Sequence, residues 1–308
     1  MRITKYRIYK PTCPEILILK ISVTNNKKIT KLSLFITLFF ALWFYTLEAT
    51  SQQYQSLPRL SQEELQRIGT LIYFNECGGK DENLVAWNEG EEFPSLGIGH
   101  FIWYPPGKEG PFRETFPALL EYYRSKRIKL PTWIDKLPNQ DPPWSNRQVF
   151  IHDATSERVG ELRQFLIDTI PIQTAFLVNR FQISLDNLLE HSPDDLHDHI
   201  KTQFYRVANS PMGMYALIDY VNFKGEGTNL SERYMGEGWG LLQVLEEMDG
   251  TEPGVSAVNQ FVKAAEKVLA RRIQNSPPER NEKRWLPGWK NRLSTYIPKV
   301  TDDSKNIN

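Results

Sequence analysis

The segment Glu76-Cys77-Gly78-Gly79 is followed by Trp87-Asn88-Glu89-Gly90 and by Ser95-Leu96-Gly97-Ile98-Gly99-His100, and this part of the chain decides the fold. It places one carboxylate at a predicted helix end, a second on a polar loop, and a hydroxyl just before a Gly-x-Gly segment. Two carboxylates that flank a cleft are the groups that cleavage of a glycosidic bond requires.

A helix is predicted directly upstream of this segment. Ser61-Gln62-Glu63-Glu64 has the pattern of a capping box, in which the serine hydroxyl and the second glutamate satisfy each other's backbone N–H groups. The apolar residues that follow fall on one helical face: Leu65, Ile68 and Ile72. Gly78-Gly79 is a stop signal, so the helix is expected to end near Glu76.

Downstream of the helix the pattern changes twice. Residues 84–98 are predicted to form a β-hairpin or small sheet, because two apolar runs surround a polar loop. After a Pro- and Gly-rich loop, helical patterns dominate, and the expected helices are 115–126, 146–169, 171–190, 193–208, 213–223, 236–248, 255–275 and 288–296. One small sheet followed by many helices predicts a predominantly α-helical α+β fold.

The charge distribution is uneven although the formal net charge is zero. Residues 1–31 hold eight Lys or Arg and one Glu, so the rest of the chain holds 29 basic and 36 acidic residues. An acidic globular part argues against nucleic-acid binding.

The N-terminus predicts a targeting segment over residues 1–50. The apolar run 32–47 follows three lysines and is shorter than the roughly 20 residues that span a bilayer. It fits a cleaved export signal. The alternatives are an uncleaved inner-membrane anchor and a buried core segment. We therefore expect the protein in the periplasm or cell envelope, with a linker over 51–60, a domain over 61–300 and a disordered tail over 301–308.

The two cysteines do not predict a disulfide. Signal cleavage would remove Cys13 and leave Cys77 alone, and the cysteines have no zinc-type spacing. His197 and His199 lie in an acidic helical stretch, for which a solvated helix face is the interpretation and a metal site the alternative. No metal or organic cofactor is expected.

Glu76 is the candidate general acid. The negative end of the helix dipole disfavours an ionised carboxyl at this position. Tyr73, Phe74 and Trp87 can desolvate it further. Both effects raise the pKa of a carboxyl, and a general acid that works near neutral pH needs a raised pKa. The alternative is a solvated glutamate at a helix end.

Glu89 is the candidate second carboxylate. In its polar loop it is expected to be ionised, as a base or an electrostatic stabiliser must be. Glu91 and Glu92 are rivals for the same role, and a solvated acidic turn is the alternative. Ser95 is the candidate to hold a water molecule.

Several aromatic and polar side chains are candidate substrate contacts. Flat apolar rings can stack on sugars, although each could also belong to the core. The aromatic candidates are Trp87, Trp103, Tyr104 and Trp144. His100 follows two glycines that permit a tight backbone beside a cleft, and it is interpreted as a hydrogen-bonding residue rather than a catalyst.

The segment Ile72–His100 resembles the catalytic segment of the phage-type lysozymes (muramidases). That family shows a helix ending in Glu-Gly, an apolar strand, a loop Asp, and Thr-Ile-Gly-Ile-Gly-His. The resemblance implies that Glu76 is the acid, Glu89 the loop carboxylate and Ser95 the water-positioning residue.

Two later segments resemble the same family in the same order. Ala216–Gly225 is similar to its buried helix ending in Phe-Asn-x-Gly, which makes Asn222 a candidate substrate contact. Pro287–Arg292 is similar to its Gly-Leu-x-x-Arg helix. The chain departs from the family in having Glu instead of Asp on the loop and a helical insertion over about 101–212.

The resemblance implies a lysozyme-like fold and a peptidoglycan-cleaving glycoside hydrolase. We expect a monomer that meets the membrane only through its N-terminal segment. A lytic transglycosylase would use Glu76 alone. A non-catalytic glycan-binding or envelope protein would keep the fold without the reaction. Another N-acetylated glycan, such as chitin, is the remaining substrate alternative.

Overall fold

The computed structural model describes residues 56–110 and 112–298, which belong to one compact unit. Most of these residues are helical, and three short strands form the only sheet among them. The longer helices are α2 (Gln62–Cys77), α3 (Phe116–Ser125), α6 (Glu157–Asp168), α7 (Ile170–Phe181), α9 (His197–Ala208), α10 (Gly213–Lys224), α12 (Val255–Asn275) and α13 (Leu286–Ser294). The shorter ones are α4 (Thr132–Asp135), α5 (Arg147–Asp153), α8 (Ser184–Glu190) and α11 (Leu241–Glu247). The predicted α-rich composition with a small sheet is confirmed.

The sheet is antiparallel, with strands β1 (Val85–Ala86), β2 (Ser95–Leu96) and β3 (Phe101–Ile102) in that order. Ser95 pairs with Ala86 on one side and with Ile102 on the other. The predicted hairpin over 84–98 is therefore present. The strand that was not predicted, β3, forms because the chain reverses again directly after β2.

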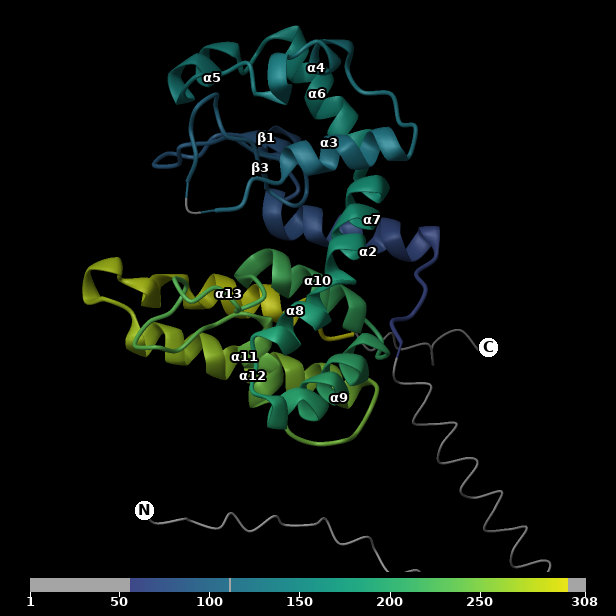
Figure 1. Ribbon diagram of the computed structural model, residues 1–308, viewed down its shortest axis with the longest axis vertical. Coiled ribbons are helices and arrows are strands. Elements are labelled where there is room, and N and C mark those ends of the chain that lie inside the picture. The colour runs from purple at the N-terminus through teal and green to yellow at the C-terminus, as the bar shows by residue number, and fades with distance from the viewer. Residues whose placement is uncertain (1–55, 111, 299–308) are drawn as a thin grey trace, which may run out of the picture. The chain divides into compact units, whose positions relative to one another are not determined.

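The elements fall into two groups that we call the sheet half (residues 80–169) and the helical half (residues 184–298). Figure 1 shows the sheet with α3–α6 at the top, α8–α13 at the bottom, and α2 and α7 between them. Helices α2 and α7 approach closely at Gly69, where an added Cβ would lie 2.2 Å from Thr174 Oγ1. Only glycine permits this approach, which fixes the helix that carries Glu76.

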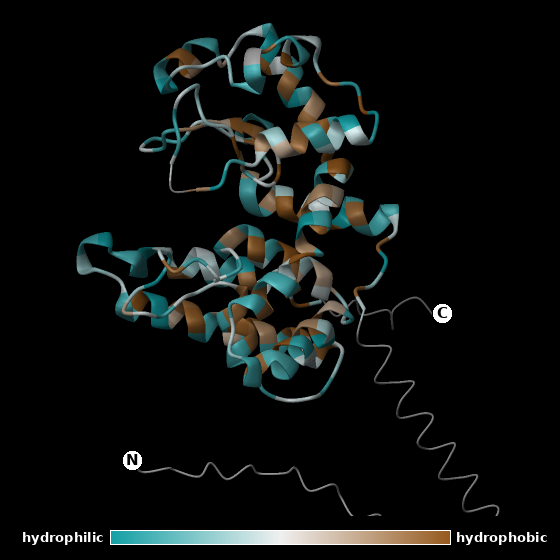
Figure 2. Ribbon diagram, in the orientation of Figure 1, coloured by the Kyte–Doolittle hydropathy of each residue, from teal (hydrophilic) through white to brown (hydrophobic). Residues whose placement is uncertain are grey.

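The core runs through both halves. Along the helices, hydrophobic residues alternate with hydrophilic ones at helical spacing (Figure 2). Helix α12 illustrates the pattern, because its buried side chains recur every three or four residues: Ala257, Val258, Phe261, Val262, Ala264, Ala265, Val268 and Leu269. Burial of each large apolar side chain contributes about 1.5–3 kcal/mol.

Four predicted helices differ from the observed ones. The helix expected over 193–208 begins only at His197, after a 3₁₀ turn over Asp194–Leu196. The helix expected over 236–248 begins only at Leu241, because the preceding glycines form a turn in which Gly240 packs against Gly227 and Gln243 bonds to both backbones. The helix expected over 146–169 is interrupted after α5, and the Ser156 hydroxyl caps α6 by accepting from the backbone N–H of Val159. The helix expected over 171–190 is two helices, α7 and α8.

The predictions for residues 1–50 and 301–308 lie outside the described residues. Within the part of the chain that the structure describes, no helix combines the length and hydropathy needed to cross a membrane.

Candidate active site

Helix α2 places Glu76 in its last turn, as predicted. The capping box at its start is present: the Glu64 backbone N–H donates to Ser61 Oγ at 3.2 Å, and the Ser61 N–H donates to Glu64 Oε2 at 2.7 Å. The helix ends at Gly78, whose φ of 61° and N–H bond to the Phe74 carbonyl form a left-handed C-cap. Local signals at both ends therefore set the position of Glu76.

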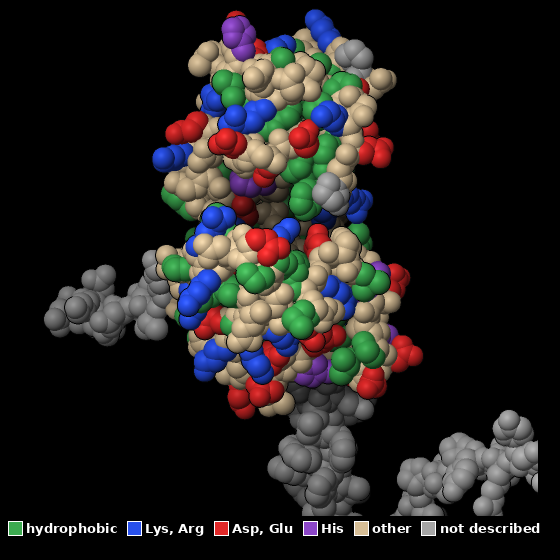
Figure 3. Space-filling model, turned by 90° about the vertical axis from the view of Figure 1, so that its left-hand side faces the viewer, with side chains coloured by type: hydrophobic (Ala, Val, Ile, Leu, Met, Phe, Trp, Pro, Cys, Tyr) green, Lys and Arg blue, Asp and Glu red, His purple; other side chains and the backbone are tan. Residues whose placement is uncertain are grey.

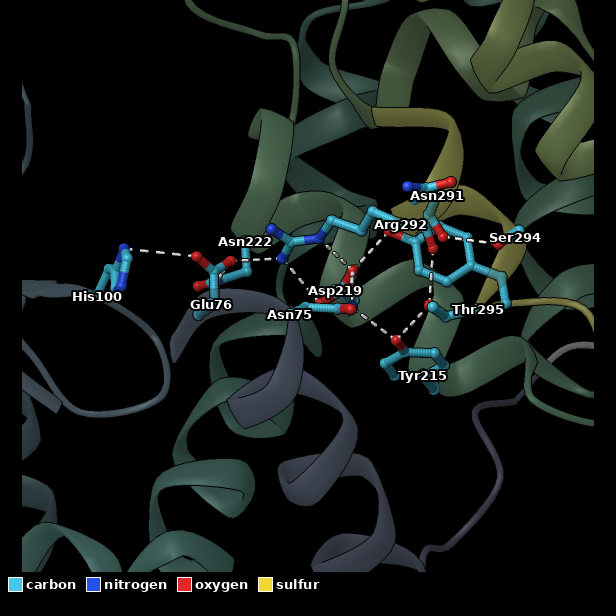
Figure 4. Close-up of polar contacts among 11 residues, drawn as sticks. Asn75, Glu76, His100, Tyr215, Asp219, Asn222, Asn291, Arg292, Ser294 and Thr295 are labelled. Carbon is cyan, nitrogen blue, oxygen red and sulfur yellow. Dashed lines mark hydrogen bonds and ion pairs between the residues drawn. The ribbon is translucent and has the colours of Figure 1, made fainter. Parts of the chain in front are cut away.

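The two carboxylate oxygens of Glu76 have different surroundings (Figure 4). Oε1 accepts from Asn222 Nδ2 at 2.9 Å and from the guanidinium of Arg292. Oε2 lies 3.4 Å from His100 Nδ1. The side chain is 11% exposed. One oxygen is thus held by two helices of the helical half, and the other faces a turn of the sheet half.

Arg292 joins Glu76 to a second, buried carboxylate. Its Nε donates to Asp219 Oδ2 and its Nη2 to Asp219 Oδ1, both at 2.8 Å. Burial opposes the charge of this guanidinium, but the carboxylates of Asp219 and Glu76 outweigh burial and raise the pKa of Arg292 well above its ordinary value. Asp219 also accepts from Tyr296 Oη at 2.6 Å and from Asn75 Nδ2 at 3.3 Å.

The turn between β2 and β3 carries His100. Gly97 has φ of 66°, and a Cβ there would lie 2.2 Å from Gln173 Oε1. The same Gln173 oxygen accepts from the Ile98 backbone N–H at 2.9 Å, so α7 holds the turn from behind. The left-handed backbone and the close approach of Gln173 both require glycine at position 97.

The space-filling view shows a hollow between the two halves (Figure 3). Histidine and acidic side chains lie within it, and Lys and Arg side chains lie at its edges. Figure 4 shows His100 of the β2–β3 turn and Glu76 of α2 pointing toward each other.

The loop between β1 and β2 carries the other three candidate carboxylates. Glu89 is exposed and takes part in no ion pair or side-chain hydrogen bond with the described residues. Glu92 pairs with Lys108 at 3.0 Å, and Glu91 accepts from Asn88 Nδ2 at 3.2 Å. Glu89 is therefore the one of the three loop carboxylates without a side-chain partner among the described residues.

Ser95 lies in β2 and is 4% exposed. Its place in the second strand of the hairpin follows the prediction, but little of its surface is open to a bound water. The water-positioning role therefore stays a prediction.

The proposed aromatic contacts need correction. Trp103 and Trp144 are fully buried in the core, and their indole N–H groups donate to the Gln140 carbonyl and to Asp153. Tyr104 is also buried and packs against Phe93. These rings cannot stack on a sugar, because their faces are covered by protein. Aromatic residue type alone did not distinguish core from cleft.

Trp87 is the aromatic candidate that keeps contact with an opening. It is 6% exposed and lines a pocket of about 340 Å³ with Glu91, Glu92, Lys108 and residues 145–148. Arg147 fixes this wall by donating from Nε to the Trp87 carbonyl at 2.9 Å.

The two helical histidines have separate contacts. His199 is half-buried, with Nε2 3.0 Å from the Leu245 carbonyl, and His197 Nε2 lies 3.7 Å from Asp194. His199 therefore packs against α11 instead of lying on a solvated face. Among residues 56–110 and 112–298, no group of three or more His, Cys, Asp or Glu side chains has the arrangement of a metal site.

Four residues of the site were not assigned a role from the sequence: Asn75, Asp219, Arg292 and Tyr296. Asp219 and Arg292 lie inside the two later segments that resemble the phage-type lysozymes, so that resemblance was the available signal. No protein-family model, curated protein or solved structure matches this chain.

Proposed function

We propose that this protein is a lysozyme-like glycoside hydrolase that cleaves peptidoglycan, with Glu76 as the general acid. The observation that carries the proposal is the asymmetry of Glu76. Asn222 and Arg292 bond Oε1, whereas Oε2 accepts no hydrogen bond from the described residues and lies 3.4 Å from His100 Nδ1. A catalytic acid needs a fixed carboxyl with one oxygen left for the substrate.

In the proposed reaction, protonated Glu76 gives its proton from Oε2 to the leaving glycosidic oxygen as the C–O bond breaks. Ionised Glu89 takes a proton from the attacking water, whose oxygen bonds to the anomeric carbon. Ser95 is proposed to orient that water. Direct attack by water requires the two carboxyl groups to lie about 6.5–9.5 Å apart when substrate is bound. The reaction requires acid–base groups alone, so the proposal includes no metal or organic cofactor.

The proposed setting follows from the sequence. An acidic domain behind an export or anchor segment would reach peptidoglycan in the periplasm or cell envelope as a monomer. His100 and Asn222 touch Glu76 directly and are proposed to contact the sugar beside the cleaved bond. Trp87 is proposed to contribute at the edge of the sheet half.

A lytic transglycosylase is the second candidate, and one observation favours it. Glu76 is held by several partners, whereas Glu89 has none among the described side chains. A transglycosylase would use Glu76 first as acid and then as base, and it would release anhydro products without Glu89.

The test uses the full chain and purified peptidoglycan, with mass spectrometry of the released fragments. Glu76→Gln should lower the rate by about 10²–10⁴-fold, because it removes the acid and keeps the shape. Glu63→Gln, an exposed change in the first turn of the same helix, is the matched control. Reducing ends support hydrolysis, and anhydro ends support the transglycosylase. Binding without release would contradict both and support a glycan-binding protein.

A further inference from the structure

A cluster of cations and aromatic rings lies beside Glu76 at the end of α10. Lys224 is the last residue of this helix and follows Asn222 and Phe223. Its Nζ lies 4.0 Å from the centroid of the Phe223 ring and 3.8 Å from that of Trp289. The guanidinium of Arg292 lies 4.3 Å from the same Phe223 ring. Lys224 and Arg292, which bonds Glu76, therefore contact the same aromatic ring.

The two arginines of this cluster already have carboxylate partners. Arg292 binds Asp219 and Glu76. Arg272, 5.4 Å from the Trp289 ring, donates two bonds to Glu282 at 2.7 and 2.9 Å. Lys224 differs from both, because its ammonium forms no hydrogen bond or ion pair with any of the residues that the structure describes.

The Phe223 and Trp289 rings favour the charge of Lys224, whereas burial and the neighbouring arginines oppose it. The side chain is half-buried. Burial, followed by the positive charges of Arg272 and Arg292, lowers the pKa of Lys224 to about 7, while Glu282 and Glu76 act in the opposite direction. Methionine would fill the same space without the free-energy cost of burying a charge. Nζ is not among the buried side-chain nitrogens cut off from solvent, so a bound anion can reach it.

We propose that Lys224 binds a carboxylate of the substrate next to the cleaved bond, and that the enzyme therefore prefers an acidic glycan to a neutral one. In peptidoglycan such carboxylates belong to the muramic acid residues and their peptide stems, whereas chitin has none. This inference rests on the proposed function. It selects between the two glycan substrates that the sequence leaves open.

The test compares three substrates: soluble peptidoglycan strands, the same strands with their carboxylates converted to methylamides, and chitin oligosaccharides. The wild-type protein should lose about 10- to 100-fold in kcat/KM on amidation, because a hydrogen bond to a charged group is lost. Lys224→Gln should bring the ratio of kcat/KM between free and amidated strands close to one, mainly through KM. Lys224→Arg should keep a preference for the free strands. Lys129→Gln, at an exposed lysine of the sheet half, is the control.

Equilibrium binding of the same strands separates this inference from the proposed function. Cleavage with an unchanged carboxylate preference in Lys224→Gln would overturn the role of Lys224 and leave the hydrolase intact. Binding that depends on Lys224 and on free carboxylates, without cleavage, would overturn the hydrolase and keep the anion site. A wild-type protein that binds neither kind of strand overturns both. Thermal unfolding of each variant checks that the fold is retained.

Discussion

The two candidate catalytic carboxylates lie in opposite environments. Glu76 is 11% exposed and is bonded by side chains from α10 and α13. Glu89 is exposed on a loop between two short strands and has no side-chain partner in the described part of the chain. The helical half thus holds the carboxylate of Glu76 in place, whereas the sheet half leaves that of Glu89 without a side-chain partner among the described residues.

The fixed side of the site depends on a buried ion pair. Asp219 has no exposed surface and would be costly to bury alone, but Arg292, Tyr296 and Asn75 all donate to it. The same guanidinium then bonds Glu76. One arginine therefore couples the stability of the helical half to the orientation of the proposed acid.

Removing that arginine should have the largest effect on stability. Arg292→Met leaves Asp219 buried without its cation, and we expect the free energy of unfolding to fall by about 3–5 kcal/mol. Urea denaturation of the full chain measures this change. Arg59→Met, at an exposed arginine, should change it by less than about 0.5 kcal/mol.

A double variant shows whether the cost comes from the orphaned charge. Arg292→Met with Asp219→Asn should recover part of the loss, because the buried carboxylate is then neutral. A double variant as unstable as the sum of the two single ones would contradict the coupling.

The contrast between the two carboxylates also shows what the sequence can predict. Helix α2, its capping box and the position of Glu76 at its end depend on neighbouring residues, and they were predicted correctly. The Arg292–Glu76 bond joins residues 216 positions apart, so no local pattern contains it. Only the resemblance of segment Pro287–Arg292 to a lysozyme helix pointed to that region.

The predictions for the aromatic residues were wrong for a different reason. Trp103 and Trp87 both lie near the sheet and have the same chemistry, yet Trp103 is sealed in the core and Trp87 lines a pocket. Packing of α3 and α5 against the sheet decides between them: Trp103 packs on Phe116, and Trp87 on Phe150. Such burial is a tertiary property that residue type does not encode.

The next largest effect on the free energy of unfolding is expected at the turn between β2 and β3. Gly97→Ala places a side chain at a φ of 66° and within 2.2 Å of Gln173 Oε1. Strain and overpacking together should cost about 2–4 kcal/mol. Gly160→Ala in α6 is the control, since nothing lies within 4 Å of its added Cβ, and it should stabilise by about 0.5–1 kcal/mol. Thermal unfolding compares the two, and equal shifts would mean that the turn is not rigid.

Lys224 should give a smaller effect that depends on pH. Since its folded pKa is about 7 and its unfolded value is about 10.4, the unfolded chain binds the extra proton between these values, and stability rises with pH there. Lys224→Met removes the free-energy cost of keeping a charged lysine in the folded protein. It should stabilise the protein by about 1–3 kcal/mol below pH 7, and the gain should shrink toward pH 10. A gain that does not change with pH would contradict the burial of a charged lysine.

The loop carboxylate should give the smallest change in stability and a large change in activity. Glu89→Gln alters an exposed side chain without partners, so the free energy of unfolding should move by less than about 0.5 kcal/mol. If Glu89 is the base, hydrolysis of peptidoglycan should fall by about 10²–10⁴-fold while the binding of strands is kept. Glu92→Gln breaks only the exposed pair with Lys108 and serves as the control in the same loop. Unchanged hydrolysis in Glu89→Gln with a large loss in Glu92→Gln would assign the role of base to Glu92 instead of Glu89. Full activity in both, with anhydro products, would show that Glu76 works alone and that the unbonded loop has no part in the chemistry.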